Sequence, residues 1–173
     1  MACGGGETHQ HQQQQRQQPP HRTMQPGALV LETTNSFGAD NARYNDVLNL
    51  RDDCFKTKNP DGLSGHNLII GTIDNKTVGY FAYYIPNNDT AFIYDVCVGT
   101  PYRGIGIGSK LFKQGIAIIE AKPDIIVLQL DVESKNDRAQ RLYQSAGFVR
   151  TGAYLEDGRF EIMRKELTKP GTP

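Results

Sequence analysis

Residues 92–111 read FIYDVCVGTPYRGIGIGSKL, and this stretch decides how the rest of the chain is arranged. β-Branched and aromatic residues dominate from Phe92 to Val98, which predicts a strand. A turn at residues 99–101 follows. Apolar residues then recur at intervals of three and four from Leu111 to Ile119, which predicts a helix. The order is therefore strand, glycine-rich loop, helix.

Three alternating glycines, Gly104, Gly106 and Gly108, lie where this predicted helix begins. The first backbone N–H groups of a helix have no partner within it, and they lie at the positive end of the helix dipole. Glycine lets a ligand approach the main chain without a Cβ in the way. Arg103 adds a planar cation suited to phosphate oxygens. The loop therefore predicts a phosphate-binding site, although a plain glycine-rich turn would show the same glycines.

The spacing of the loop excludes two common phosphate-binding motifs. A dinucleotide fingerprint needs G-x-G-x-x-G and a P-loop needs G-x-x-x-x-G-K-[ST], whereas Ser109 here precedes Lys110 and the glycines alternate. The string R-G-x-G-I-G after a strand ending V-x-V resembles the acetyl-CoA loop of the GNAT superfamily of N-acetyltransferases. That loop has the pattern [QR]-x-x-G-x-[GA], and Arg103, Gly106 and Gly108 match it.

A second block, residues 131–148, resembles a later motif of the same superfamily. In that motif a strand ends, an Asn follows, and a helix carries A-x-x-L-Y before G-F. Here the matching residues are Asn136, Ala139, Leu142-Tyr143 and Gly147-Phe148. Two motifs in the right order are far more specific than one glycine loop. The resemblance covers roughly residues 28–167 and implies an acetyl-CoA-dependent N-acetyltransferase.

The resemblance also implies how acetyl-CoA, the co-substrate, is held. It places the pantetheine arm against the backbone of Val96, Cys97 and Val98, where a free N–H could polarise the thioester oxygen. It assigns a contact with the same arm to Asn136. The pyrophosphate is assigned to the loop residues Arg103, Gly104, Ile105, Gly106, Ile107, Gly108 and Ser109.

The chemistry needs a proton donor and a proton acceptor. Tyr143 matches the superfamily Tyr that protonates the departing thiolate. An alkyl amine with a pKa of about 10.4 is mostly protonated at neutral pH, so something must accept its proton. Tyr94 stands where many relatives carry a Glu base, and strand alternation should send the adjacent Asp95 to the opposite face. We therefore expect a water relay that ends on Tyr94 or on a nearby acid, with Asp131 and Glu133 as further carboxylates.

The remaining elements follow from periodicity and turn residues. The fold class they predict is α+β, with a mixed, mostly antiparallel central sheet of about seven strands flanked by helices, in agreement with the GNAT acyl-CoA N-acyltransferase fold. The first helix should either help to wall the acceptor site, with Asp52, Asp53 and Phe55, or present a solvated face. Strands are predicted at 28–33, 67–73, 77–85, 90–98, 125–132, 148–155 and 159–167, and helices at 39–55, from the glycine loop to before 123, and at 138–145.

Composition limits the domain organisation and the environment. Residues 1–26 are rich in Gln and poor in apolar residues, so we interpret them as a disordered tail. Residues 27–168 form the predicted N-acetyltransferase domain, and residues 169–173 a frayed end. The chain has 19 basic and 19 acidic residues, which gives no sign of direct nucleic-acid binding. No apolar run approaches the roughly 20 residues that a bilayer requires.

The chain contains three cysteines, Cys3, Cys54 and Cys97. An odd, scattered set predicts neither a disulfide framework nor a metal site. A reducing, cytoplasmic location is the simplest interpretation, with the nucleus also open.

Two hypotheses about function remain open from the sequence. The first is an enzyme that moves an acetyl group to a primary amine by direct attack in a ternary complex, without a metal and as a monomer or homodimer. Its acceptor is a small, polyamine-like amine or a peptide or protein amine. The alternative is a catalytically weak GNAT-fold module that binds CoA as a regulatory ligand. The R-G-x-G-I-G-S string resembles diamine acetyltransferases, whereas A-x-x-L-Y-x-x-x-G-F is shared with peptide-acting members.

Overall fold

The computed structural model describes residues 27–34, 42–56, 62–87 and 89–169 of the chain. The Gln-rich segment 1–26, the first residues of the predicted helix 39–55 and residues 170–173 lie outside this part. No helix in the ranges given is long and apolar enough to cross a membrane.

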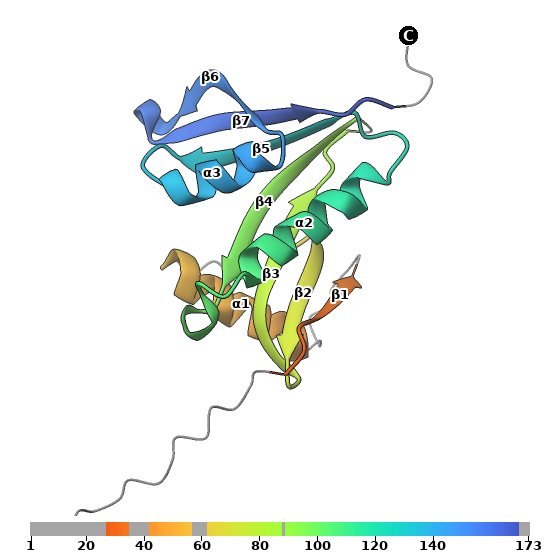
Figure 1. Cartoon of the computed structure of the whole chain (residues 1–173), viewed down its shortest axis with the longest axis vertical. Coiled ribbons are helices and arrows are strands. Elements are labelled where there is room, and N and C mark those ends of the chain that lie inside the picture. Colours follow the sequence, from red (N-terminus) through yellow and green to blue (C-terminus); the bar gives the residue numbers. More distant parts are fainter. Residues whose placement is uncertain (1–26, 35–41, 57–61, 88, 170–173) are drawn as a thin grey trace, which may run out of the picture.

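The described residues form seven strands and three α-helices, close to the predicted ranges (Figure 1). Two short 3₁₀ turns follow β4 and β6. The elements in chain order are β1 (Val30–Thr34), α1 (Ala42–Phe55), β2 (Asn67–Ile73), β3 (Lys76–Tyr84), β4 (Thr90–Val98), η1 (Thr100–Tyr102), α2 (Ile107–Glu120), β5 (Val127–Glu133), α3 (Asp137–Ser145), β6 (Val149–Leu155), η2 (Glu156–Gly158) and β7 (Phe160–Glu166).

All seven strands belong to one sheet with the order β1-β2-β3-β4-β5-β7-β6. Only the β4–β5 pair is parallel, because α2 carries the chain back across the sheet between them. The last strand, β7, lies between β5 and β6 and is antiparallel to both. The prediction of a mixed, mostly antiparallel sheet flanked by helices is therefore confirmed.

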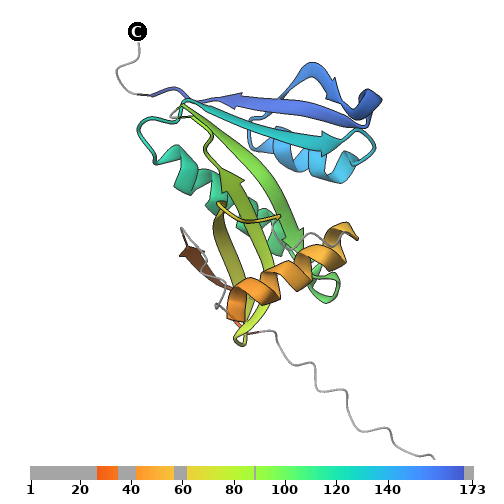
Figure 2. The same cartoon turned by 180° about the vertical axis from the view of Figure 1, so that it is seen from behind.

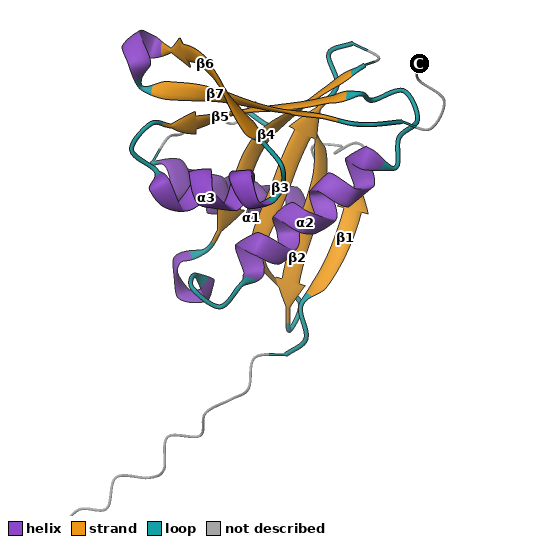
Figure 3. Ribbon diagram, turned by 45° about the horizontal axis from the view of Figure 1, so that its top comes forward, coloured by secondary structure: helices purple, strands orange, loops and turns teal. Residues whose placement is uncertain are grey.

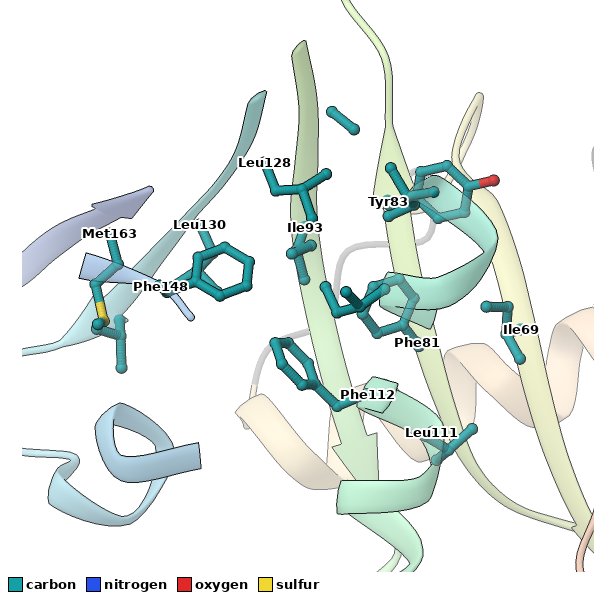
Figure 4. Packing of buried hydrophobic residues seen from close by; sticks show 14 of the residues in the cluster. Ile69, Phe81, Tyr83, Ile93, Leu111, Phe112, Leu128, Leu130, Phe148 and Met163 are labelled. Carbon is teal, nitrogen blue, oxygen red and sulfur yellow. The ribbon is translucent and has the colours of Figure 1, made fainter. Parts of the chain in front are cut away.

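The helices cover opposite faces of the sheet. Helices α2 and α3 lie on one face and α1 on the other (Figures 1 and 2). Under α2, the rings of Phe81 and Phe112 have their centroids 6.0 Å apart, and Phe112 is equally far from Phe148 (Figure 4). A Cβ on Gly115 of α2 would lie 2.6 Å from the Phe81 ring. The helix therefore approaches the sheet this closely only because Gly115 has no side chain.

The parallel ladder between β4 and β5 is short. It pairs four residues on each strand, from Thr90 with Val127 to Ile93 with Leu130, after which the strands diverge (Figure 3). The register of β4 against β3 shifts at the same place. Ala82 is opposite Asp95 and Tyr83 is opposite Ile93, so Tyr94 is the extra residue of a β-bulge. A bulge bends its strand and increases the local twist, which explains why β4 leaves β5 here.

Candidate functional site

Two cavities open where β4 and β5 diverge. The loop cavity, of about 480 Å³, is lined by the end of β4, the glycine loop and α3. The sheet cavity, of about 730 Å³, is lined by β4, β5, α3 and the turn between β6 and β7. The two cavities share six lining residues, so they meet there. The shared residues are Cys54, Phe55, Val96, Asn136, Ala139 and Tyr143.

The glycine loop leaves open space at the start of α2. Gly106 caps the helix with φ 87°, and Gly104 has φ 83°. Both values lie in the left-handed region that glycine adopts at little cost. Apart from its chain neighbours, no described residue has an atom within 4 Å of the position that a Cβ would take on either glycine, and both glycines line the loop cavity. The unpaired N–H groups at the start of α2 thus face a space that suits an anion.

Most of the predicted loop residues line this cavity, but two do not. Arg103, Gly108 and Ser109 are in the lining together with the two glycines above. Ile107 is 4% exposed and packs in the core under α2, and Ile105 is 59% exposed. Their side chains therefore do not face the cavity: that of Ile107 enters the core beneath α2, and that of Ile105 lies in solvent.

Arg103 connects the loop to the strand and to α1. Its Nε donates a hydrogen bond to the Val98 carbonyl at 2.8 Å, and its Nη2 lies 3.4 Å from the Cys54 sulfur. The side chain is exposed, and the guanidinium has further N–H groups to donate. A ligand that pairs with the end of β4 would compete with Arg103 for the Val98 carbonyl.

The open edge of β4 begins after the short ladder. Val96, Cys97 and Val98 lie beyond Ile93, the last residue that pairs with β5, and all three line the loop cavity. Their other edge is paired with β3. The backbone of β4 is therefore available for an extended ligand on the side where β5 has moved away.

Tyr143 lies on the wall between the two cavities. Its ring centroid is 5.0 Å from that of Phe112 and 6.3 Å from that of Phe148. Burial raises the pKa of the Tyr143 hydroxyl to about 12, with a further contribution from the negative charge of Asp95. The hydroxyl is therefore protonated at neutral pH and can act as a donor.

Asn136 lies beside Tyr143 as the N-cap of α3. Its Oδ1 accepts a hydrogen bond from the Ala139 N–H at 3.1 Å, and its Nδ2 has no partner among the described residues. The buried side chain of Gln140 holds this turn in place, because its Nε2 donates to the carbonyls of Glu133 and Ser134 at 3.2 and 3.1 Å. Gln140 was not predicted as a site residue, and nothing in the sequence distinguishes it from the other polar residues of α3.

The prediction that Tyr94 and Asp95 point to opposite faces is wrong. The bulge at Tyr94 interrupts the alternation, so both side chains lie on the α1 side and near Arg51. The Arg51 Nε is 2.8 Å from Asp95 Oδ2, the Tyr80 hydroxyl donates to the same oxygen at 3.1 Å, and the Arg51 guanidinium carbon is 5.9 Å from the Tyr94 ring centroid. The Asp95 side chain is only 9% exposed. Its carboxylate therefore serves a buried ion pair.

Tyr94 is 44% exposed and belongs to a group of rings on the α1 side of the sheet. Its centroid is 4.4 Å from that of His66 and 6.2 Å from that of Tyr84. Tyr84 in turn stacks on Phe92 at 5.4 Å. Tyr84, Phe92 and Tyr94 line the sheet cavity, so this cavity has an aromatic wall.

The prediction of no disulfide is also wrong. Cys54, in the last turn of α1, and Cys97, on β4, form a disulfide with their Cα atoms 6.2 Å apart. Without the bulge, Cys97 would face α2 together with Ile93, and the two cysteines could not meet. Because disulfides persist in oxidising compartments, the cysteine pattern no longer supports the inference of a reducing compartment.

The sheet cavity is acidic although the chain as a whole is neutral. Among the described residues, its lining includes the carboxylates of Asp95, Asp131, Glu133 and Glu156, against one cation, Arg159. Arg159 bridges Glu133 at 3.5 Å and Glu156 at 3.4 Å. Burial raises the pKa of Asp131 above its ordinary value of 3.8.

Of the α1 residues expected near the acceptor, Phe55 lines both cavities, whereas Asp52 and Asp53 line neither. The carboxylate of Asp53 instead pairs with Lys56 at 3.1 Å. Within the described ranges, no group of three or more His, Cys, Asp or Glu residues is placed to hold a metal ion.

The chain is similar to known proteins in both sequence and structure. The family described as "Acetyltransferase (GNAT) family" matches residues 31–148. No curated protein sequence matches the chain significantly. A GNAT family acetyltransferase from Elizabethkingia anophelis with acetyl-CoA bound is 19% identical, with a TM-score of 0.65 over 80% of this chain and 98% of that chain.

Two further solved structures act as examples of the same fold. The ribosomal-protein-S18-alanine N-acetyltransferase from Escherichia coli is 18% identical, with a TM-score of 0.67 over 82% of this chain and 97% of that one. A chain of the NatC complex bound to Gag peptide and CoA is 20% identical, with a TM-score of 0.65 over 81% of this chain and 99% of that one. Because the sequence identities are only 18–20%, the similarity to these three structures shows a shared fold alone.

Proposed function

This chain belongs to the acetyltransferase (GNAT) family, and we propose that it moves the acetyl group of acetyl-CoA to a primary amine by direct attack in a ternary complex. The observation that carries this proposal is the meeting of the two cavities at Val96, Asn136 and Tyr143. One cavity suits the donor and the other the acceptor, so the reacting atoms would meet at the shared wall. Holding two reactants in such a geometry supplies a large part of catalysis.

The loop cavity fits the CoA part of the donor. The unpaired N–H groups at the start of α2 and the open space above Gly104 and Gly106 suit a pyrophosphate, and Arg103 supplies a cation beside them. The free edge of β4 can pair with an extended amide-containing arm as a further strand would. Asn136, whose Nδ2 has no partner among the described residues, lines the same cavity as the end of β4 and is our candidate for a further contact with this arm.

The proposed role of Tyr143 is to donate a proton to the sulfur as the thioester breaks. A hydroxyl with a pKa of about 12 keeps its proton at neutral pH. The thiolate develops in the same buried wall, where desolvation raises its basicity as it raises that of the phenol. A backbone N–H at Val96 or Val98, on the open edge of β4, is our candidate for polarising the thioester oxygen.

The proposed acceptor is a primary amine, either a small amine or the amine of a peptide. Two proteins of the same fold have peptide or protein partners: one is named as a ribosomal-protein-S18-alanine N-acetyltransferase, and the other belongs to the NatC complex bound to Gag peptide. The acidic, aromatic sheet cavity suits an acceptor that arrives as a cation, since alkyl amines are mostly protonated at neutral pH.

The test is a turnover screen with purified protein. Release of the CoA thiol is measured with acetyl-CoA and a panel of diamines, monoamines, peptides with a free N-terminus and lysine peptides. Turnover with at least one amine, and an acetylated product by mass spectrometry, is the expected result. Tight binding of acetyl-CoA without turnover of any amine would instead favour the regulatory CoA-binding module.

A further inference from the structure

We propose that Asp131 is the proton acceptor of the reaction, and that the sheet cavity selects amines that arrive as ammonium ions. The inference rests on the proposed function and adds the end point of the proton relay to it. It is carried by the position of Asp131, by the engagement of the other carboxylates in the cavity and by the rings that surround it.

Asp131 lies at the point where the sheet opens. The last residues that pair across β4 and β5 are Ile93 and Leu130, so Tyr94 and Asp131 are the next residues on the two strands. Both line the sheet cavity, together with Tyr143. Asp131 is absent from the lining of the loop cavity, so it faces the proposed acceptor and not the donor.

The other carboxylates of the cavity are engaged. Asp95 is held by Arg51 and Tyr80, and Glu133 and Glu156 share Arg159. Asp131 makes no hydrogen bond or ion pair with any described residue. Among the described residues of the cavity, Asp131 is therefore the one carboxylate that can accept a proton without losing a hydrogen bond or an ion pair.

The rings of the cavity suit a cation. Tyr84, Phe92 and Tyr94 form one wall and Phe160 another. The guanidinium of Arg159 already lies over the Phe160 ring, with its central carbon 4.9 Å from the centroid. Aromatic faces attract ammonium groups in the same way, so an ammonium ion beside Asp131 would have both a counter-charge and an aromatic wall.

Other titratable groups surround Asp131 on the neighbouring elements. The acids that face the cavity are Asp95, Glu133 and Glu156. The cations are Arg159 and, on β7, Arg164, which is opposite Gln129. The phenols are Tyr84, Tyr94 and Tyr143. Among these groups, the raised pKa of the Asp131 carboxyl has one cause, the partial burial that disfavours its charged form.

The proton balance of the proposed step is complete. The ammonium nitrogen gives one proton to Asp131, directly or through one water, and Asp131 passes it to solvent. The nitrogen lone pair forms the N–C bond, and the C–S bond breaks with its electron pair on sulfur. The sulfur takes a proton from the Tyr143 hydroxyl, and the phenolate recovers one from the nitrogen of the new amide.

The test compares Asp131→Asn with the wild-type protein on two kinds of acceptor. One is the best alkyl amine of the screen, and the other is an alkoxyamine, whose nitrogen is unprotonated at neutral pH. With the alkyl amine, kcat/KM should fall by about 10²–10⁴-fold, the usual loss of a general base. With the alkoxyamine it should fall by less than about tenfold, because no proton has to be removed before attack.

Three further measurements separate a catalytic role from a structural one. The acidic limb of the wild-type pH profile of kcat/KM should be absent in Asp131→Asn. Asp131→Glu should recover part of the rate, and Asp46→Asn on the exposed side of α1 should match the wild type. The melting temperature of Asp131→Asn at neutral pH should not fall, because a carboxyl with a raised pKa destabilises the folded state when it is ionised.

The outcomes distinguish the two proposals. If the wild-type protein turns over neither kind of amine, the proposed function is wrong and this inference falls with it. If the wild type is active and Asp131→Asn keeps its rate with the alkyl amine within about threefold, the proposed function stands and Asp131 is not the proton acceptor. An equal loss with both acceptors would also overturn the inference, because it would indicate a role in binding or in folding.

Discussion

Replacement of Tyr143 by Phe removes one hydroxyl and leaves the packing of the ring unchanged. The ring lies against Phe112 and Phe148, which a Phe ring would contact equally. The hydroxyl makes no hydrogen bond to any described residue, so its loss leaves no buried partner unpaired. We therefore expect the free energy of unfolding to change by less than about 0.5 kcal/mol, as for a substitution that disturbs no packing.

The effect on the rate should be much larger. Loss of a positioned proton donor costs about 10²–10⁴-fold in rate, which is about 3–5 kcal/mol of activation free energy. The pKa of Tyr143 is about 12, whereas an ordinary thiol has a pKa of about 8.5. We expect desolvation of the thiolate to narrow this gap without inverting it. Full proton transfer to sulfur would then still be uphill, so we expect the lower part of the range, about 10²–10³-fold. The loss should fall on kcat, because the negative charge on sulfur develops only toward the transition state.

The assay is steady-state release of CoA with the best acceptor, accompanied by calorimetric titration of acetyl-CoA. Tyr154→Phe is the matched control, because Tyr154 is 51% exposed on β6 and lines neither cavity. The control should retain wild-type kcat. A Tyr143→Phe protein that keeps kcat within about threefold, with the chemical step rate-limiting, would show that Tyr143 only packs the wall between the cavities.

Three other predictions test the loop, the disulfide and the ion pair. Gly106→Trp should weaken acetyl-CoA binding in calorimetry, because the new side chain fills the open space above the loop. Gly65→Trp is the control: Gly65 also has a positive φ and open space around it, so the substitution should strain the backbone similarly and leave binding unchanged. If Gly106→Trp binds acetyl-CoA as tightly as the wild type, the pyrophosphate binds elsewhere. Cys54 and Cys97 are 43 residues apart, so reduction of their disulfide should lower the free energy of unfolding by up to about 4 kcal/mol, from the loss of chain-entropy restriction in the unfolded state. Identical melting curves with and without a phosphine reductant would contradict the presence of the bond. Arg51→Leu should destabilise the protein by about 3–5 kcal/mol in urea titration, because it leaves a buried carboxylate without its counter-charge; a loss below about 1 kcal/mol would show that solvent reaches that carboxylate.

The sequence by itself determined the order of the elements and the glycine loop. Runs of β-branched residues predicted β4 and β5. The predicted end of α3 at Gly147 is confirmed, and this glycine has a positive φ of 90°. These features are local, because they depend on the preferences of residues close together in the chain. The same local patterns led to the family, since both motifs are short and continuous.

The tertiary structure decided which side chains meet. Because of the β-bulge at Tyr94, Asp95 and Cys97 point to the sheet face that α1 covers. No residue preference in the sequence predicts a bulge at that position. Strict alternation, the rule available from sequence, therefore gave the wrong face for Asp95 and hid the disulfide. The β4–β5 ladder ends beside the same bulge, at Ile93 and Leu130, because the bulge bends β4 away from β5. That divergence opens the sheet cavity at Asp131, the carboxylate that we propose as the proton acceptor.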